Sequence, residues 1–459
     1  MTLRNIEPST AAPLRVVPKP DFNASLELTT ASTLLAVTRP LPTSVAKSLD
    51  LLAFAGDTGL LFTRETVGLA ARGEAMRIPL PGGTRSVAHV RAVLGAIASD
   101  DPLHRAGTGA VAFGALAFAP DEAGELIVPR EIVAKSSDGS AWWTRIDPLI
   151  ESTDSPTMPE LTMPELSLPR LPAWSPHGFD LHSSVSHPVW CEIIATAVEQ
   201  IRNETDDPEG LRKVVLARSV DVQATDPFVV GDILARLHAL FPSCMVFSIE
   251  GFIGASPELL VSRKGSSLRA HPLAGTVARS GDPETDAKLA AGLLASAKDR
   301  WEHLLVIDAL DEVLRPLCDE LDVPQSPSIV PLRNVSHLGT LITGSLRAAD
   351  VVDRTAPTAL ELVSVLNPTP AVGGVPQAKA LAVIAELEPV SRGTYAGPVG
   401  WVDAAGNGEW AVGLRSARIE GNRARMFAGG GIVGDSEPGD ELAETQLKLQ
   451  ALLAAVVRP

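Results

Sequence analysis

Hydrophobic positions along the chain recur with two different periods, and this predicts a mixture of helices and strands. Residues 187–203 and 283–317 carry apolar residues at three- and four-residue spacing, which is typical of amphipathic helices. The second segment opens with Pro283 and an acidic first turn, a common helix start. Residues 211–222 instead alternate polar and β-branched positions, which predicts a strand.

Short apolar runs separated by turn residues predict further strands at both ends of the chain. The run 109-GAVAFGALAFAP-120 has the small and apolar residues of a strand buried on both faces. Residues 331–346 are also strand-like. Beyond residue 391, three runs joined by glycine-containing turns predict consecutive antiparallel strands, followed by an amphipathic helix.

A proline-rich segment at 148–178 divides the chain. Its prolines recur every few residues, and TMPEL occurs in tandem at 157–161 and 162–166. Because proline removes a hydrogen-bond donor and fixes φ, we expect an extended surface connection here. It separates residues 1–147, in which no chemical constellation stands out, from residues 179–459, which hold the candidate chemistry.

Composition narrows the class of protein. The chain has 459 residues, of which 45% are hydrophobic, so it can bury a large core. Its formal net charge is −16, whereas binders of nucleic acid or of anionic membranes are usually basic. We therefore expect neither partner. An anionic substrate would need local compensation from a metal or from well-placed Lys and Arg residues.

Cysteine usage and the N-terminus favour a cytoplasmic protein. Cys191, Cys244 and Cys318 are far apart, and they form neither a zinc-binding spacing nor a disulfide framework. The first residues contain no apolar core long enough for a signal peptide. No run approaches the ~20 apolar residues of a membrane span.

The strongest candidate chemistry lies in 429-GGGIVGDSEPGDELAETQLK-448. Three glycines lead through a turn into the expected helix, which places Glu441 and Glu444 on one face with Lys448 one turn further on. Backbone N–H groups of glycines can close on an anion. Two acids at i and i+3 can hold a hard cation. The simpler alternative is a glycine-rich turn and a solvated helix with an ordinary Glu–Lys pair.

A second acidic pair repeats the same spacing. Asp299 and Glu302 stand at i and i+3 in the helix expected over 283–317. Each acidic pair by itself is more simply a solvated helix face. Two helices that each offer such a pair are what a metal site shared between two elements would need.

Nine strings between about residues 185 and 456 resemble the motifs of the chorismate-utilising enzymes, which are the isochorismate, salicylate, anthranilate and aminodeoxychorismate synthases. In chain order they are KVVLAR, GASPELL, HPLAGT, KDRWEH, NVSHLGT, NPTPAVGGVP, RGTYAGPVGW, GLRSARI and GGGIVGDSEPGDELAET. The resemblance implies an α+β fold with two large packed antiparallel β-sheets, flanking helices and a single active-site cleft. Residues 1–147 would then be the divergent first part of the same fold.

The resemblance also implies a Mg²⁺-dependent reaction on chorismate, a dicarboxylate. Glu302 and Glu444 match the family's two Mg²⁺ ligands, and Asp299 and Glu441 match the supporting acids. The other matching positions contact substrate carboxylates (Arg415, Gly429 and Lys448) or line the pocket (Ala274, Gly275, Thr276 and Tyr395). His337 matches a histidine close to the substrate ring, and we expect it to be a catalytic residue.

Lys213 and Glu258 are the residues that indicate which reaction the chain performs. The resemblance implies that Lys213 activates a water molecule that attacks C2 of the ring, while Glu258 gives a proton to the departing C4 hydroxyl. A neutral lysine would require desolvation or a neighbouring cation, since its usual pKa is ~10.4. Glu258 would need an apolar setting that raises its pKa. This combination predicts an isochorismate synthase, an isomerase that feeds siderophore, menaquinone or salicylate synthesis.

Three alternatives stay open at this level. A salicylate synthase uses the same base, acid and metal, and then eliminates pyruvate. An ammonia-using synthase is disfavoured by Lys213, and a non-catalytic chorismate-binding homologue is disfavoured by the intact set of site residues. The chain departs from its relatives at Asn367, where they often have histidine. Relatives of this type are often monomers, which is the expectation here.

Overall fold

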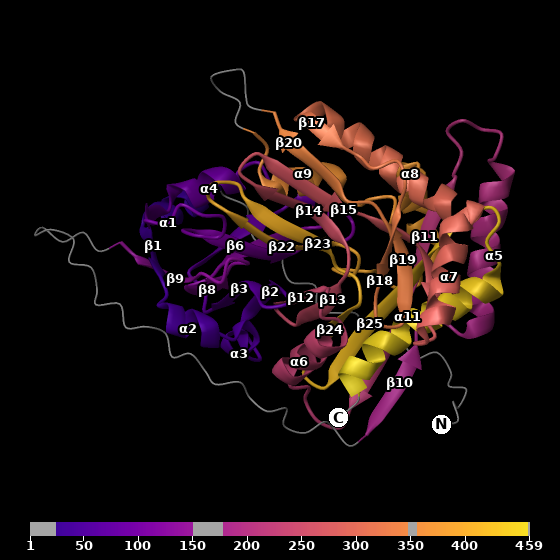
Figure 1. Cartoon of the computed structure of the whole chain (residues 1–459), viewed down its shortest axis with the longest axis horizontal. Coiled ribbons are helices and arrows are strands. Elements are labelled where there is room, and N and C mark those ends of the chain that lie inside the picture. Colours follow the sequence, from indigo (N-terminus) through magenta and orange to yellow (C-terminus); the bar gives the residue numbers. More distant parts are fainter. Residues whose placement is uncertain (1–23, 150–177, 348–355, 458–459) are drawn as a thin grey trace, which may run out of the picture.

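The computed structural model describes residues 24–149, 178–347 and 356–457. Two large β-sheets lie face to face, with a small third sheet and helices around them (Figure 1). Nearly all strand pairs are antiparallel, the pairing of β1 with β5 being parallel. The predicted α+β fold with two large packed sheets and flanking helices is therefore confirmed.

The larger sheet combines strands from all three thirds of the chain. In spatial order it contains β10 (Phe179–Ser183), β11 (Lys213–Ala224), β25 (Arg423–Ile432), β24 (Ser416–Glu420), β13 (Phe252–Ser256), β12 (Met245–Ile249), β2 (Leu60–Arg64), β3 (Val67–Arg72), β8 (Glu131–Lys135), β9 (Ala141–Pro148), β1 (Leu34–Pro40) and β5 (Ala98–Asp100), with β21 (Gly374–Val375) paired to β11 off this path.

The second sheet has nine described strands, and a three-stranded sheet stands beside it. The nine are β17 (Cys318–Asp322), β20 (Ile342–Leu346), β15 (Ser267–His271), β14 (Leu259–Lys264), β23 (Gly408–Val412), β22 (Pro398–Asp403), β6 (Val111–Ala115), β7 (Gly124–Val128) and β4 (Met76–Leu80). The small sheet contains β16 (Leu273–Ala278), β19 (Val335–Gly339) and β18 (Ser328–Pro331).

The helices cover the outer faces of the sheets. They are α1 (Ala24–Ser32), α2 (Thr43–Ser48), α3 (Leu51–Ala55), α4 (Val90–Ala96), α5 (His187–Asn203), α6 (Val230–Leu240), α7 (Pro283–Ala295), α8 (Ala297–Leu314), α9 (Ala359–Leu366), α10 (Gln377–Leu387) and α11 (Pro438–Val457), with short 3₁₀ turns at Gly83–Arg85 and Arg315–Leu317.

A core of large side chains fills the space between the two big sheets. Phe62 and Phe247 point inward from the larger sheet, and Phe113 and Trp401 meet them from the other. All four are almost fully buried. Burial of such side chains from water is the main term that holds the two sheets together.

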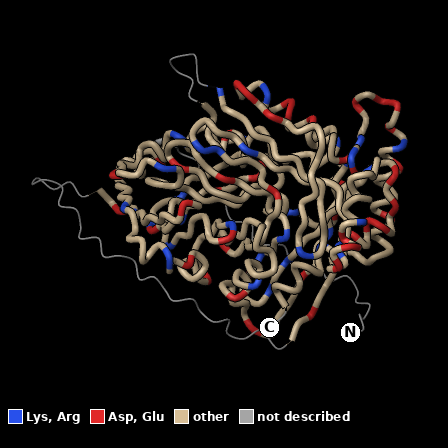
Figure 2. The backbone as a smooth tube through the Cα atoms, viewed as in Figure 1, with Lys and Arg blue, Asp and Glu red and all other residues tan. Residues whose placement is uncertain are grey.

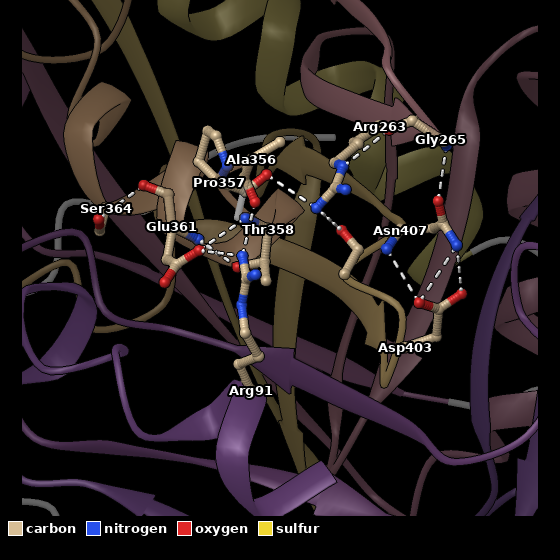
Figure 3. A network of polar contacts seen from close by, with 11 residues as sticks. Arg91, Arg263, Gly265, Ala356, Pro357, Thr358, Glu361, Ser364, Asp403 and Asn407 are labelled. Atoms are coloured by element: carbon tan, nitrogen blue, oxygen red, sulfur yellow. Dashed lines mark hydrogen bonds and ion pairs between the residues drawn. The ribbon is translucent and has the colours of Figure 1, made fainter. Parts of the chain in front are cut away.

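The first third of the chain shares both sheets with the rest. β2 pairs with β12, and β6 pairs with β22. Figure 3 shows a polar network that adds to these contacts: Arg91 of α4 donates to Ala356 O at 2.7 Å and pairs with Glu361 of α9 at 2.9 Å. In the same network Arg263 of β14 donates to Pro357 O. The segment entering α9 is thus held from both sides.

Several predicted elements are confirmed, and one is wrong. The helix at 187–203 is α5, and the predicted strand at 211–222 is β11. The single helix expected over 283–317 is instead α7 followed by α8. Ser296, whose ψ of 116 is extended, separates them and caps α8 by accepting a hydrogen bond from the N–H of Asp299. Most of the expected connection at 148–178 lies outside the described residues.

Charged residues of both signs are mixed along the described chain. Figure 2 shows Lys and Arg scattered among Asp and Glu along the backbone trace, with acidic residues dense in the loop after α5. Within the described part, no helix has the length and apolar character needed to cross a membrane.

Candidate active site

One cavity collects almost all of the predicted site residues. It lies where the small sheet, α8, β25 and α11 converge. Thirteen of the fourteen predicted positions line it, and Lys213 is the exception. Those thirteen are Glu258, Ala274, Gly275, Thr276, Asp299, Glu302, His337, Tyr395, Arg415, Gly429, Glu441, Glu444 and Lys448.

The start of α8 brings its two acids against β16. Because Ser296 ends α7 and caps α8, Asp299 and Glu302 fall in the first two turns of α8. Gly275 lies in β16 with φ of 77, and a Cβ at this position would be 3.1 Å from Cβ of Asp299. Glycine is therefore needed here for the helix to approach the strand so closely.

The second acidic pair comes from α11. Glu441 is almost fully buried, and burial, reinforced by the nearby Glu444 carboxylate, raises its pKa to about 7. Glu444 pairs with Lys448 at 2.7 Å. Burial opposes the charge of Lys448, but the Glu444 carboxylate outweighs burial and raises the lysine pKa. Lys448 Nζ also donates to Gly429 O at 2.9 Å.

Lys213 lies directly behind the cavity wall. It is fully buried at the start of β11, and its Nζ lies 3.0 Å from Glu302 Oε1, although without the alignment of a hydrogen bond. A Cβ on Gly431 would be 2.1 Å from Glu302 Oε1 and 3.1 Å from Lys213 Cε. The neighbour of this lysine is therefore an anion rather than the cation that would favour its neutral form.

Each of three site carboxylates has a lysine partner in this arrangement. The pairs are Glu302 with Lys213, Glu444 with Lys448, and Glu441 with Lys298, the last at 3.3 Å. Glu441 Oε2 is buried and has no hydrogen-bond partner within the described chain. In the described ranges, no group of three or more His, Cys, Asp or Glu side chains stands in position to hold a metal ion.

Glu258 lies on another wall of the cavity, between β13 and β14. Its side chain is 2% exposed, and burial raises its pKa to about 8, although the charge of Lys213 works in the opposite direction. The backbone N–H of Glu258 donates to Ser256 Oγ at 3.2 Å, and Ser256 Oγ donates to Val412 O at 2.6 Å. The raised pKa favours the protonated carboxyl at neutral pH, and the hydrogen bonds of Ser256 hold the backbone of this turn.

His337 and Arg415 form a connected pair. His337 Nδ1 lies 3.2 Å from Gly275 O, which can only accept, so we assign the ring proton to Nδ1. Nε2 is then free to accept from Arg415 Nη2 at 3.1 Å. Burial, together with the charges of Arg415 and Lys448, holds the pKa of His337 well below its usual value. The imidazole is neutral, with both nitrogens engaged.

Arg415 keeps an unused donor in the cavity. Its backbone φ is 48, and its guanidinium lies 5.4 Å from the ring centre of Phe241. Nη1 is buried and finds no partner among the residues that the structure describes. Because an unpaired buried cation is costly, this nitrogen is suited to bind an anion.

Tyr395 completes the wall opposite α8. Its ring stacks on Phe427 with 5.0 Å between centroids, and burial raises the pKa of its hydroxyl. Asn367 is not among the lining residues. It caps the end of α9, and its side-chain Nδ2 donates to Phe118 O at 3.4 Å.

The sequence did not predict two of the charged residues that line the cavity. Lys298, in the first turn of α8, pairs with Glu441, and Arg392 lies against β11. Lys298 belongs to KDRWEH and Arg392 to RGTYAGPVGW, so the motifs contained them. Nothing in their spacing indicated that they face the cavity, because their partners come from distant segments.

Comparisons with known proteins identify the family of the chain. Residues 62–457 match the model of a family described as chorismate binding enzyme. The isochorismate synthase DhbC of Bacillus subtilis is 42% identical over 257 residues, which cover 54% of this chain and 63% of that protein. The isochorismate synthase EntC of Escherichia coli is 42% identical over 246 residues, 52% of this chain and 61% of that protein.

Solved structures extend the likeness to most of the chain. The menaquinone-specific isochorismate synthase MenF of Escherichia coli superposes with a TM-score of 0.74 at 27% identity, covering 94% of this chain and all of that one. Anthranilate synthase component I of Streptococcus pneumoniae shares the fold, with a TM-score of 0.64 at 22% identity over 85% of this chain and 92% of that one. The chain therefore belongs to the family of chorismate binding enzymes.

Proposed function

We propose that this chain is an isochorismate synthase, a Mg²⁺-dependent isomerase that converts chorismate to isochorismate. The observation that carries the proposal is Glu258, a buried carboxyl whose raised pKa favours its protonated form, in a cavity that Arg415 and Lys448 also line. The reaction needs such an acid, because the C4 hydroxyl must gain a proton to leave. The relatives named isochorismate synthase at about 40% identity support the same assignment.

Cationic groups of the chain would bind the two carboxylates of chorismate. Arg415 offers its unpaired Nη1, and Lys448 reaches the cavity beside Gly429. In this proposal His337 is a positioning residue, because its Nε2 accepts from Arg415 and its neutral ring has no proton to give at that nitrogen. We therefore propose that His337 orients Arg415 and has no direct catalytic role.

The acidic residues fit a hard divalent cation in their chemistry. Glu302 and Glu444 would hold Mg²⁺, with Asp299 and Glu441 in support, and the buried, unpartnered Oε2 of Glu441 favours a cation here. When bound, the ion would neutralise the C1 carboxylate of the substrate. In the structure, lysines pair with Glu302, Glu441 and Glu444, and these lysines balance the negative charge of the carboxylates.

Lys213 would act as the base. It must give up its ion pair with Glu302 and lose a proton before it can accept one from water. The water then adds to C2, both ring double bonds shift by one position toward C4, and Glu258 protonates the C4 oxygen, which leaves as water. One water enters and one departs, so the product is an isomer of the substrate.

Product analysis tests the proposal. Purified protein is incubated with chorismate and Mg²⁺, and the products are separated by chromatography and identified by mass. The proposal predicts an equilibrium mixture of chorismate and isochorismate without pyruvate. Salicylate with stoichiometric pyruvate would make the chain a salicylate synthase. Binding of chorismate without turnover would make it a silent homologue.

A further inference from the structure

β11, the strand that begins with Lys213, has a gap along one of its edges. β25 pairs with one edge from Val214 to Gln223. On the other edge, β21 pairs only with Lys213 and Val214, and β10 pairs only from Val220 onward. Between them, residues 215–219 face no strand within the described chain. Backbone groups left unpaired in a buried strand cost free energy, so this gap must be filled by other means.

An ion pair fills the middle of the gap. Arg392 Nη2 donates to Val215 O at 2.6 Å, and Glu388 Oε1 accepts from the N–H of Ala217 at 2.7 Å. The two side chains also bind each other, with Arg392 Nε 2.9 Å from Glu388 Oε2. One guanidinium and one carboxylate thus offer β11 a donor and an acceptor at the spacing that a neighbouring strand would supply.

The same pair ties other walls of the cavity to β11. Arg392 Nη1 donates to Val372 O at 2.8 Å, and the guanidinium lies 4.1 Å from the ring centre of Phe118. Val215, Val372 and Arg392 all line the cavity. Phe118 belongs to the first third of the chain, so the pair joins that third to the strand that carries Lys213.

Stability alone does not explain an ion pair in this place. The side chains of Arg392 and Glu388 are 2% and 4% exposed. Two apolar residues of similar volume are often as stable as a buried ion pair, or more so. Two apolar side chains, however, could not bind the carbonyl of Val215 and the N–H of Ala217.

We propose that Glu388 and Arg392 form a positioning unit that takes the place of a strand beside β11 and fixes Lys213 relative to the cavity. Lys213 is two residues from Val215, and this edge is held otherwise by the two-residue strand β21 and by hydrogen bonds from the N–H groups of Arg212 and Val215 to Val375 O and Gly373 O, both at 2.8 Å. The inference rests on the proposed function in so far as Lys213 is the base of the reaction. It adds two residues that act through β11 and not through substrate.

The test is the double variant Glu388→Met/Arg392→Met, compared with Asp221→Met/Arg425→Met. The control pair is also joined by two hydrogen bonds, between Asp221 of β11 and Arg425 of β25, with Arg425 Nε 2.8 Å from Asp221 Oδ1. Neither residue of this pair lines the cavity. We expect the first variant to stay folded with a lower Tm, because the carbonyl of Val215 and the N–H of Ala217 lose their partners. Well below its unfolding temperature it should lose about a hundredfold in kcat, as for a reacting group displaced by ~1 Å, with KM changed only a few-fold. The control should keep its kcat.

A second variant and a second readout keep the test decisive. If the double variant does not fold, Arg392→Lys, which retains the charge but not the planar fork, should show the same loss in kcat. Amide hydrogen exchange at Ala217 should become faster in either variant, and this readout does not depend on turnover. Wild-type kcat in the double or the lysine variant, an equal loss in the control, or unchanged exchange at Ala217 would overturn the inference. Failure of the wild-type protein to form isochorismate would overturn the proposed function instead.

Discussion

Burial raises the pKa of Glu258 against the opposing charges of Lys213 and Lys448, and the proposed chemistry depends on this shift. The carboxyl is enclosed by the turn between β13 and β14, and its pKa is about 8 even though Lys213 favours the charged form. A group that must give a proton at neutral pH works best when its pKa lies near that pH. A pKa of about 8 therefore suits Glu258 to the acid role that we propose for it.

The first prediction concerns this residue. Glu258→Gln keeps the shape of the side chain and removes the acidic proton, so kcat should fall by about 10²–10⁴-fold. In the wild-type protein the acid form is populated below the pKa and lost above it. The rate kcat/KM measured against pH should therefore decline as pH rises through about 8. An unchanged rate in the variant would show that Glu258 is not the acid.

The second prediction uses the buried ion pair of Lys213. Glu302→Gln leaves a fully buried ammonium without its anionic partner, so the free energy of unfolding without Mg²⁺ should fall by roughly 3 kcal/mol. Glu284→Gln, which breaks the exposed pair with Lys288, should change it by less than about 1 kcal/mol. Urea denaturation measures the free energy of unfolding of both variants. Equal effects in the two variants would contradict the account.

The same residue tests the metal proposal. A ligand that binds the folded state raises its stability by mass action. Mg²⁺ should therefore raise the Tm of the wild-type protein and leave the Tm of Glu302→Gln unchanged.

Most of the site residues could be predicted from the sequence, because the nine motifs contain twelve of the thirteen predicted residues that line the cavity, and the thirteenth, Lys448, follows the last motif by three residues. Lys298 and Arg392 were missed because a side chain's neighbours across the fold are not encoded in local spacing.

At the scale of elements, the site depends on how closely a strand and two helices approach. Gly430 and Gly431 of β25 face the acids of α11 and α8, and Cβ atoms there would meet Glu441 Oε2 at 2.8 Å and Glu302 Oε1 at 2.1 Å. The sequence predicted helices carrying the acids, but it did not predict the end of α7 at Ser296. The apolar period continues across this position, and only the hydrogen bond of the cap marks the new start.

The third prediction follows from this close approach. Gly431→Ala should displace the Glu302 carboxylate and reduce kcat/KM by about tenfold or more, because a methyl group cannot share its space. Gly439→Ala is the control, since nothing lies within 4 Å of a Cβ at that position in α11. Steady-state kinetics gives kcat/KM for both variants. Full activity in Gly431→Ala would mean that Glu302 is not held where the structure places it.

At the scale of the whole molecule, the cavity is built by segments far apart in the sequence. The strands of the first third complete both sheets, through β2 beside β12 and β6 beside β22. Alternating hydrophobicity predicted that strands exist, but it could not give their order, because pairing between distant strands depends on packing that no local pattern records. The resemblance to a family supplied the layered architecture that periodicity did not.

The most direct measurement of the central claim is to run the reaction in water labelled with heavy oxygen and to follow the products by mass. If water attacks C2 and the C4 hydroxyl leaves, isochorismate formed early in the reaction must carry one heavy oxygen while the remaining chorismate is unlabelled. Label should enter chorismate only later, as the reverse reaction returns it. Isochorismate without label, or pyruvate released in step with consumption of chorismate, would contradict the account.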